Sequence, residues 1–323
     1  MRAQTRNYLV PEMPRPAQLA HFLSLSLLPL NMNLRILDHK VLADVPSASG
    51  IEIIGDTIYM MGDDSPWLFR MNRQFQLEEK IQIGDITKAI DGKIPKPEKP
   101  DLEAMAAFGQ DLLLFGSGSK SPQRDVLVWI DPAQPLDLKK YPLVKFYDHL
   151  CKSADFTRKD LNIEAAVIID EILYLFNRGK NQIIKINARS FLEYVKGFQE
   201  IPTIETVVVT LPAINGIGAG FSGAAATPDK TQILFTASVE NTSNWIDDGE
   251  VLGSFIGLLP IDSLKDNCVP PCLPITDQKK NTLNIKVESV AVHHSISSNS
   301  LHLMMVTDTD GSASEVIEAQ LEW

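Results

Sequence analysis

The sequence predicts an all-β protein, a single-domain five-bladed β-propeller. Two observations favour this fold: a pair of apolar stretches joined by a turn recurs five times along the 323 residues, and further strand-like stretches follow each pair. Four strands in a repeat of about 60 residues are typical of a propeller blade. A third observation concerns closure. Residues 34–45 read as a strand with no blade of its own, and we expect it to become the outer strand of the last blade, which leaves no open sheet edge.

Each repeat begins with a small or acidic residue. In the first three repeats, thirteen positions separate this residue from the end of the second apolar stretch, and turn signals such as Gly55-Asp56 fall at the same place. Two later repeats have longer turns, so successive starts lie 54, 61, 58 and 66 residues apart. We call these five the starting residues: Ser49, Glu103, Glu164, Ser222 and Glu288.

The remaining strands follow from apolar and β-branched runs. Third strands are predicted at 67–72, 125–131, 181–187, 254–262 and 315–323. Fourth strands are predicted at 75–84, 204–211 and 281–286. Residues 143–151 fit a strand or a helix equally well, and residues 188–198 have the apolar spacing of a helical insertion. The domain then covers residues 33–323, and residues 1–32 form an N-terminal extension, disordered or derived from a misassigned start.

The composition narrows the choice of partners. With 30 Lys and Arg against 41 Asp and Glu, the net charge of -11 repels phosphate backbones, so we expect no nucleic-acid partner. No apolar stretch reaches membrane-spanning length, and we expect a monomer away from membranes. The three cysteines are too few for a disulfide framework, and we expect ordinary thiols. The cytoplasm is slightly favoured over a secreted or periplasmic location.

The starting residues predict a cation site. The innermost strands of a propeller line its channel, so five equivalent residues form a ring around the axis. Three carboxylates cannot all remain charged there without a counterion; their pKa values rise or a cation binds among them. Oxygen ligands suit Ca²⁺ or another hard divalent cation. The alternative is a polar, water-filled channel in which the glutamates accept hydrogen bonds from neighbouring backbone.

The order Ser, Glu, Glu, Ser, Glu on successive inner strands resembles the soluble calcium-activated apyrases. This resemblance covers most of residues 45–305 as short matches, including Gly220-Phe221-Ser222 and Lys286-Val287-Glu288. It implies a five-bladed propeller with an axial Ca²⁺. The chain departs from the family pattern at two places. Ser65-Pro66 follows the pair Asp63-Asp64, and the loop Gly116–Lys120 differs from that of the family. Bacterial propellers of unknown function and esterase-like phytase domains share similar inner strands.

Loops after the second strands gather at one mouth of the channel, where propellers usually bind substrates. There we expect Asp63 or Asp64 to orient or deprotonate a water and Arg178 to neutralise phosphate. Glu240 lies in another of these loops, where the apyrases also have an acidic residue. These residues predict a metal-dependent hydrolase of a phosphoester or other ester, with a small-molecule substrate. The alternative is a non-catalytic propeller that binds an unknown protein partner and holds a structural ion.

His293-His294 also suggests metal binding. Neighbouring side chains on a regular strand point to opposite faces, so we expect the pair not to share one ion.

Overall fold

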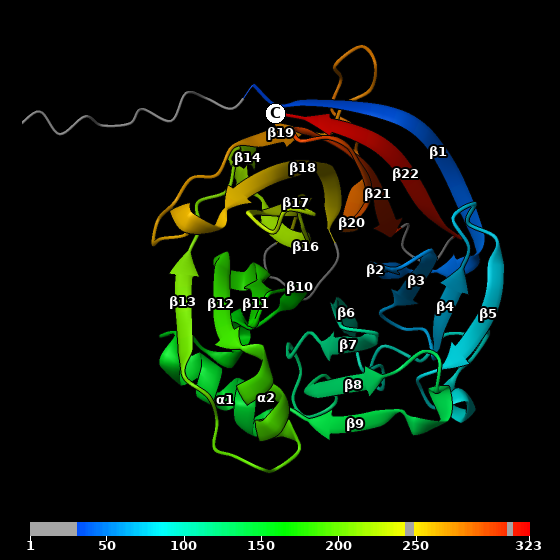
Figure 1. Ribbon diagram of the computed structural model, residues 1–323, viewed down its shortest axis with the longest axis vertical. Helices are drawn as coiled ribbons and strands as arrows, with labels where there is room; N and C mark the ends of the chain where they lie inside the picture. The colour runs from blue at the N-terminus through cyan, green and yellow to red at the C-terminus, as the bar shows by residue number, and fades with distance from the viewer. Residues whose placement is uncertain (1–30, 243–248, 309–312) are drawn as a thin grey trace, which may run out of the picture. The chain divides into compact units, whose positions relative to one another are not determined.

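The computed structural model describes residues 31–242, 249–308 and 313–323. Five four-stranded sheets surround a central axis, and each inner strand contacts the inner strands of both neighbouring sheets (Figure 1). This arrangement confirms the five-bladed propeller predicted from the repeats.

The strands of every blade are antiparallel, and the first four blades follow the order of the chain. Blade one contains β2 (Ala48–Ile54), β3 (Thr57–Gly62), β4 (Trp67–Met71) and β5 (Leu77–Gln82). Blade two contains β6 (Leu102–Phe108), β7 (Asp111–Gly116), β8 (Val126–Ile130) and β9 (Lys139–Pro142). Blade three contains β10 (Ile163–Ile169), β11 (Ile172–Asn177), β12 (Gln182–Asn187) and β13 (Ile204–Val208).

The last two blades have longer central strands. Blade four contains β16 (Gly220–Ala226), β17 (Gln232–Asn241), β18 (Glu250–Pro260) and β19 (Cys272–Pro274). Blade five contains β20 (Lys286–Ser297), β21 (Ser300–Asp308), β22 (Ala313–Glu322) and β1 (Asn33–Pro46). A short hairpin precedes blade four and consists of β14 (Ala213–Ile214) and β15 (Ile217–Gly218).

The N-terminal strand closes the ring, as predicted. β1 runs antiparallel to β22, with Asn33 opposite Glu322 at one end and Pro46 opposite Ala313 at the other. The closing blade therefore joins the two ends of the described propeller through backbone hydrogen bonds along a whole strand.

Two helices lie on the outer side of blades two and three (Figure 1). Residues 143–151, which fit a strand or a helix equally well in the sequence, belong to helix α1 (Val144–Ser153), where Phe146, Tyr147 and Leu150 share one buried face. α2 (Ala188–Val195) confirms the predicted helical insertion. The ring centroids of Phe146 and Phe191 lie 4.9 Å apart, so the two helices pack against each other as well as against the blades.

The predicted outer strand of blade four is wrong. The strand is β19, and Leu273 pairs with Ile256 on β18. Prolines occupy positions 270, 271 and 274, in and directly before this short strand, and proline has no N–H group to donate to a ladder. The pairing is therefore short, and the sequence pattern does not predict a strand here. The segment predicted instead, residues 281–286, folds back on its own loop through the bridge between Thr276 and Thr282, and Lys286 already belongs to β20.

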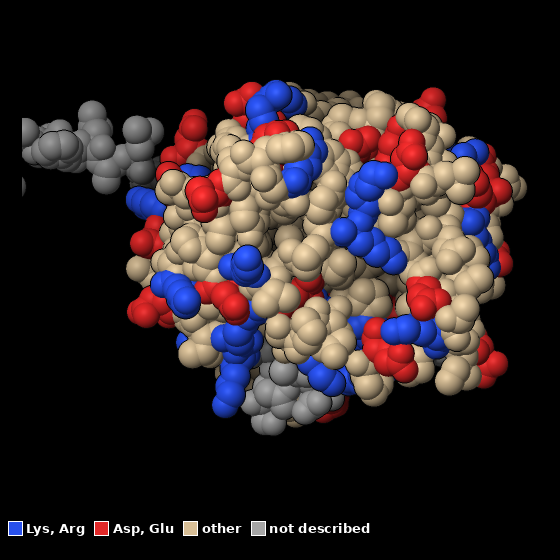
Figure 2. Space-filling model, turned by 90° about the horizontal axis from the view of Figure 1, so that it is seen from below, with Lys and Arg blue, Asp and Glu red and all other residues tan. Residues whose placement is uncertain are grey.

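Five short 3-10 helices complete the described elements: η1 (Ile86–Lys88), η2 (Pro135–Asp137), η3 (Arg158–Asp160), η4 (Arg178–Lys180) and η5 (Ile261–Ser263). Basic and acidic side chains are interspersed on the side of the propeller seen in Figure 2, and neither sign covers it continuously. Among the helices of the described residues, none has the length and apolar character needed to cross a bilayer.

Candidate functional site

Each starting residue is a β-bulge. In every blade the register between the first and second strands shifts, and the residue left out of the ladder is the starting residue: Ser49, Glu103, Glu164, Ser222 and Glu288. A bulge leaves one residue without a directly opposed partner and re-aims its side chain. The repeat found in the sequence therefore recurs as one backbone irregularity at the same place in all five blades.

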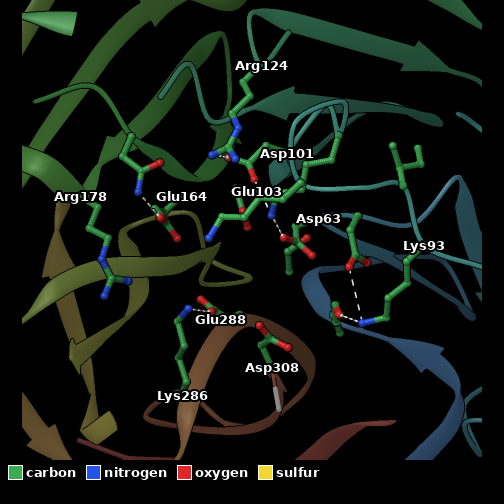
Figure 3. A pocket seen from close by; sticks show the side chains of 18 of the residues that line it. Asp63, Lys93, Asp101, Glu103, Arg124, Glu164, Arg178, Lys286, Glu288 and Asp308 are labelled. Atoms are coloured by element: carbon green, nitrogen blue, oxygen red, sulfur yellow. Dashed lines mark hydrogen bonds and ion pairs between the residues drawn. The ribbon is translucent and has the colours of Figure 1, made fainter. Parts of the chain in front are cut away.

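A cavity of about 510 Å³ opens at this end of the channel. Among the described residues, its lining includes eight carboxylates and six lysine or arginine side chains. The labelled side chains in Figure 3 come from different blades and converge on one space. Four starting residues line it, and Ser222 does not. The site is therefore densely charged and carries both signs.

On one side of the cavity, three carboxylates meet. One oxygen each from Asp63, Asp101 and Glu103 lies within 4.8 Å of the others, and we call these residues the three-carboxylate cluster. Lys99 forms ion pairs with Asp63 and with Asp101, the latter at 2.7 Å. Arg124 contacts Asp101 at 2.6 Å. Three carboxylates thus share two cations.

The opposite side repeats this ratio in a second group, the Arg178 cluster. Arg178 lies 2.6 Å from Glu240 and also donates a hydrogen bond to Ser238. Lys286 lies 3.2 Å from Glu240 and 2.8 Å from Glu288. Glu164 completes this cluster and accepts a hydrogen bond of 2.5 Å from Asn162.

Burial and crowding raise the pKa values of the channel glutamates. Burial is the largest cause for Glu103, and the nearby charges of Asp101 and Asp63 raise its pKa further, well above the usual range. Burial raises the pKa of Glu288 to about 8, although Lys286 opposes the shift. The pKa of Glu164 is raised for the same first reason. A cation bound among these carboxylates would favour their charged form and lower the same pKa values.

The two serines of the ring have protein partners. Ser49 donates a hydrogen bond of 2.6 Å to the carbonyl oxygen of Leu102 in the next blade, and it still lines the cavity. Ser222 is fully buried and lies 3.1 Å from the hydroxyl of Thr236. The glutamates therefore face the cavity together, and the Ser222 hydroxyl lies apart from them.

The four candidate catalytic residues also line the cavity, in two pairs. Asp63 and Asp64 follow β3, and Lys93 lies 3.5 Å from Asp64. Oδ1 of Asp64 is buried and accepts no hydrogen bond from the described residues. Burial and the Asp63 charge raise the pKa of Asp64. Arg178 and Glu240 bind each other instead, which leaves the guanidinium little freedom to contact a phosphate.

Sequence reasoning missed several channel residues that have a recognisable signal. Asp101, Asn162 and Lys286 each stand two positions before a starting glutamate, with an apolar residue between. Alternation along an extended chain brings such a pair to one face. In blades two, three and five the polar–apolar–polar triplet therefore marks both channel residues. Lys99 and Arg124 come from connecting segments, where this alternation gives no guidance.

A sequence profile of a family of unknown function, DUF6929, matches residues 44–321. No curated protein matches the chain. Among solved structures, glutaminyl cyclase from Myxococcus xanthus is 10% identical and covers 91% of this chain and 98% of its own, with a TM-score of 0.51. Hydrazine synthase from Kuenenia stuttgartiensis is 12% identical and covers 82% of this chain and 77% of its own, with a TM-score of 0.44. The likeness to glutaminyl cyclase concerns the fold, and neither structure is named as an apyrase.

Proposed function

The chain belongs to the DUF6929 family, and from the chemistry of its channel we propose that it binds a hard divalent cation, with calcium as the expected ion, and hydrolyses a small phosphoester or other ester at the channel mouth. The observation that supports this proposal is the three-carboxylate cluster, whose ligand oxygens converge within 4.8 Å. Lys99 and Arg124 contact Asp63 and Asp101 of this cluster, and burial, together with the nearby charges of Asp101 and Asp63, raises the pKa of Glu103.

The residues fit a hard cation by their chemistry. All three side chains offer carboxylate oxygens, and calcium accepts six to eight oxygen ligands in flexible geometry, with waters completing the shell. The ammonium of Lys99 contacts two of the three carboxylates, so it must share or yield this position when a cation binds. Glu103 releases its proton on binding, because only the ionised carboxylate is a good ligand.

Asp64 is the best candidate for the base in the cavity. Its buried Oδ1 has no hydrogen-bond donor among the described residues and is thus available to a water molecule. A pKa raised by burial makes this carboxylate a stronger base than an exposed aspartate. A bound divalent cation would polarise an ester oxygen. Lys93, beside Asp64, is placed to neutralise negative charge on the substrate.

We assign Arg178 and Glu240 a structural role, in place of the phosphate-binding role expected from the sequence. Arg178 is 5% exposed and is bound to Ser238 and Glu240, so its charge holds the channel together. Phosphate recognition then depends on two lysines that line the same cavity, Lys93 and Lys96.

A screen of nucleotides, small phosphoesters and carboxylic esters, in calcium and in chelator, tests this function. We expect calcium-dependent turnover that Asp64→Asn lowers at least about 100-fold, the usual contribution of a general base. Asp56→Asn in an exposed turn is the matched control and should retain full activity. Turnover that is independent of calcium, or that survives Asp64→Asn, would contradict the proposal.

The second candidate is a non-catalytic propeller that binds a small molecule or a protein partner. Lys99, Arg124 and Lys286 all form ion pairs with carboxylates in the channel. Because the chain neutralises its own carboxylates in this way, this observation favours the second candidate. A calcium-binding chain with no turnover on any ester class would support this candidate over the hydrolase.

A further inference from the structure

Three histidines meet in blade five, outside the channel cavity. His293 and His294 belong to β20, and His302 belongs to β21. Nδ1 of His293 lies 3.1 Å from Nδ1 of His302 and 3.0 Å from Nδ1 of His294. Half of the six histidines of the chain therefore turn their nitrogens toward one point.

A second bulge in β20 explains this contact. His294 pairs with His302 on β21, and the register shifts between Val292 and His294, so that His293 is an extra residue in the ladder. A bulge interrupts the alternation that sends neighbouring side chains to opposite faces. The expectation that His293 and His294 cannot share an ion, which assumed a regular strand, is therefore wrong for this geometry.

The spacing suits a transition metal. Two nitrogens bound to one tetrahedral zinc ion at 2.0–2.1 Å lie about 3.3 Å apart. The two Nδ1 separations, 3.0 and 3.1 Å, are close to this value, and one nitrogen from each ring lies within 4.8 Å of the others. The three ring planes are steeply inclined to one another, at 63°, 85° and 90°, which lets three lone pairs converge without stacking the rings.

The surroundings support a neutral His302 that offers Nδ1 to a metal. Its other nitrogen, Nε2, lies 3.1 Å from a carboxylate oxygen of Glu318 on β22, although this contact is not aligned as a hydrogen bond. A carboxylate behind a histidine favours the proton on the nitrogen that faces it and leaves the other free to bind. Glu318 also contacts Lys40 of β1 at 2.6 Å. Arg73 contacts the backbone oxygen of His293.

We propose that His293, His294 and His302 form a binding site for a divalent transition metal of the zinc type, with a fourth position open to water. Imidazole nitrogens prefer such ions to calcium, so this site differs in chemistry from the three-carboxylate cluster. His294 is exposed and gives the site access to solvent. With Glu318 and Lys40 behind it, the site links all four strands of the blade that closes the ring.

Cobalt titration of the metal-stripped full-length protein tests the proposal. We expect one equivalent of Co²⁺ to give the visible absorption of a tetrahedral ion, and ZnCl₂ but not CaCl₂ to remove it. His294→Gln and His302→Gln should each weaken binding more than 100-fold, and Glu318→Gln by about 10–100-fold. His149→Gln on α1 is the matched control and should bind normally, as should Glu103→Gln.

A second readout needs no variant. In the proton spectrum of the native chain, zinc should shift or broaden the imidazole signals of three histidines at one equivalent. Absence of a saturable cobalt band, or a band that persists in folded His293→Gln, His294→Gln and His302→Gln proteins, would overturn the proposal. So would zinc that leaves all imidazole signals unchanged.

Discussion

The Nζ atom of Lys286 lies 2.8 Å from Oε1 of Glu288, two residues further along β20. The innermost strand of blade five therefore carries a counterion for its own starting glutamate. Glu103 on β6 has no such basic residue two positions earlier, where Asp101 adds a second negative charge. Both sides hold carboxylates and cations in the same ratio, but Glu288 has its counterion on its own strand, whereas the residue in that place beside Glu103 is another carboxylate, which makes the Glu103 side the better place for a bound cation.

Stability without metal should depend on pH through the channel glutamates. An unfolded glutamate ionises near pH 4.5, whereas burial raises the pKa of Glu288 to about 8 in the folded protein. Between these values the folded state holds a proton that the unfolded state has lost, so the free energy of unfolding falls as the pH rises through this window. Urea denaturation in chelator should show a flatter dependence for Glu288→Gln than for the native chain.

The exposed Glu205 provides the control for this pH series. Glu205→Gln should retain the native slope between pH 4.5 and 8. Identical slopes for Glu288→Gln and the native chain would show that Glu288 stays ionised in the fold and that Lys286 outweighs burial.

Removal of Lys99 should expose the calcium requirement of the three-carboxylate cluster. Lys99→Met leaves Asp63 and Asp101 without their shared ammonium, and breaking a buried ion pair costs about 3–5 kcal/mol. In chelator the variant should unfold at clearly lower urea, and calcium should restore more stability to it than to the native chain. Lys88→Met, which alters an exposed pair, should change the free energy of unfolding by less than about 1 kcal/mol.

If calcium stabilises Lys99→Met no more than it stabilises the native protein, Lys99 does not occupy the place where the cation binds, and this prediction is contradicted.

Arg178 should matter for stability before it matters for substrate binding. Arg178→Met removes the guanidinium that contacts Glu240 and Ser238, and we expect a loss of about 3 kcal/mol in urea denaturation. Arg178→Lys should recover only part of it, because one ammonium cannot reproduce the planar arrangement of donors. Arg189→Met at an exposed position is the control. A stable Arg178→Met protein with weakened substrate binding would return the arginine to the role expected from the sequence.

Ser49 should behave as a structural contact between blades. Its hydroxyl donates to the Leu102 carbonyl, so Ser49→Ala should cost about 1 kcal/mol and leave calcium affinity unchanged. A tenfold weaker calcium affinity in this variant would show that the hydroxyl is a ligand and that the ring of five holds the ion.

The repeat made the propeller predictable, because the first three repeats keep the same spacing from the starting residue to the end of the hairpin and the last two show the same pattern with longer turns. Closure by residues 34–45 was predictable too, since a lone strand at one end matched a missing strand at the other. β19 was not, because prolines reduce its ladder to three residues. Its short pairing depends on the loop that carries it, which no local pattern describes.

The place of the three starting glutamates in the channel was predictable. Glu103, Glu164 and Glu288 face the cavity because each occupies the same bulge. The counterion Lys99 was missed, since a loop brings it to the channel and its position follows no period. The histidine cluster was missed because a bulge changes which face a side chain occupies without changing the composition of the strand.

Calorimetric titration of calcium into the metal-stripped protein tests the central claim most directly, with Glu103→Gln and Glu288→Gln compared with the native chain. We predict one calcium per native chain, at least tenfold weaker binding in Glu103→Gln, and near-native binding in Glu288→Gln, where Lys286 already supplies the positive charge. No calcium binding to the native chain, or equal losses in the two variants, would contradict a cation held by Asp63, Asp101 and Glu103.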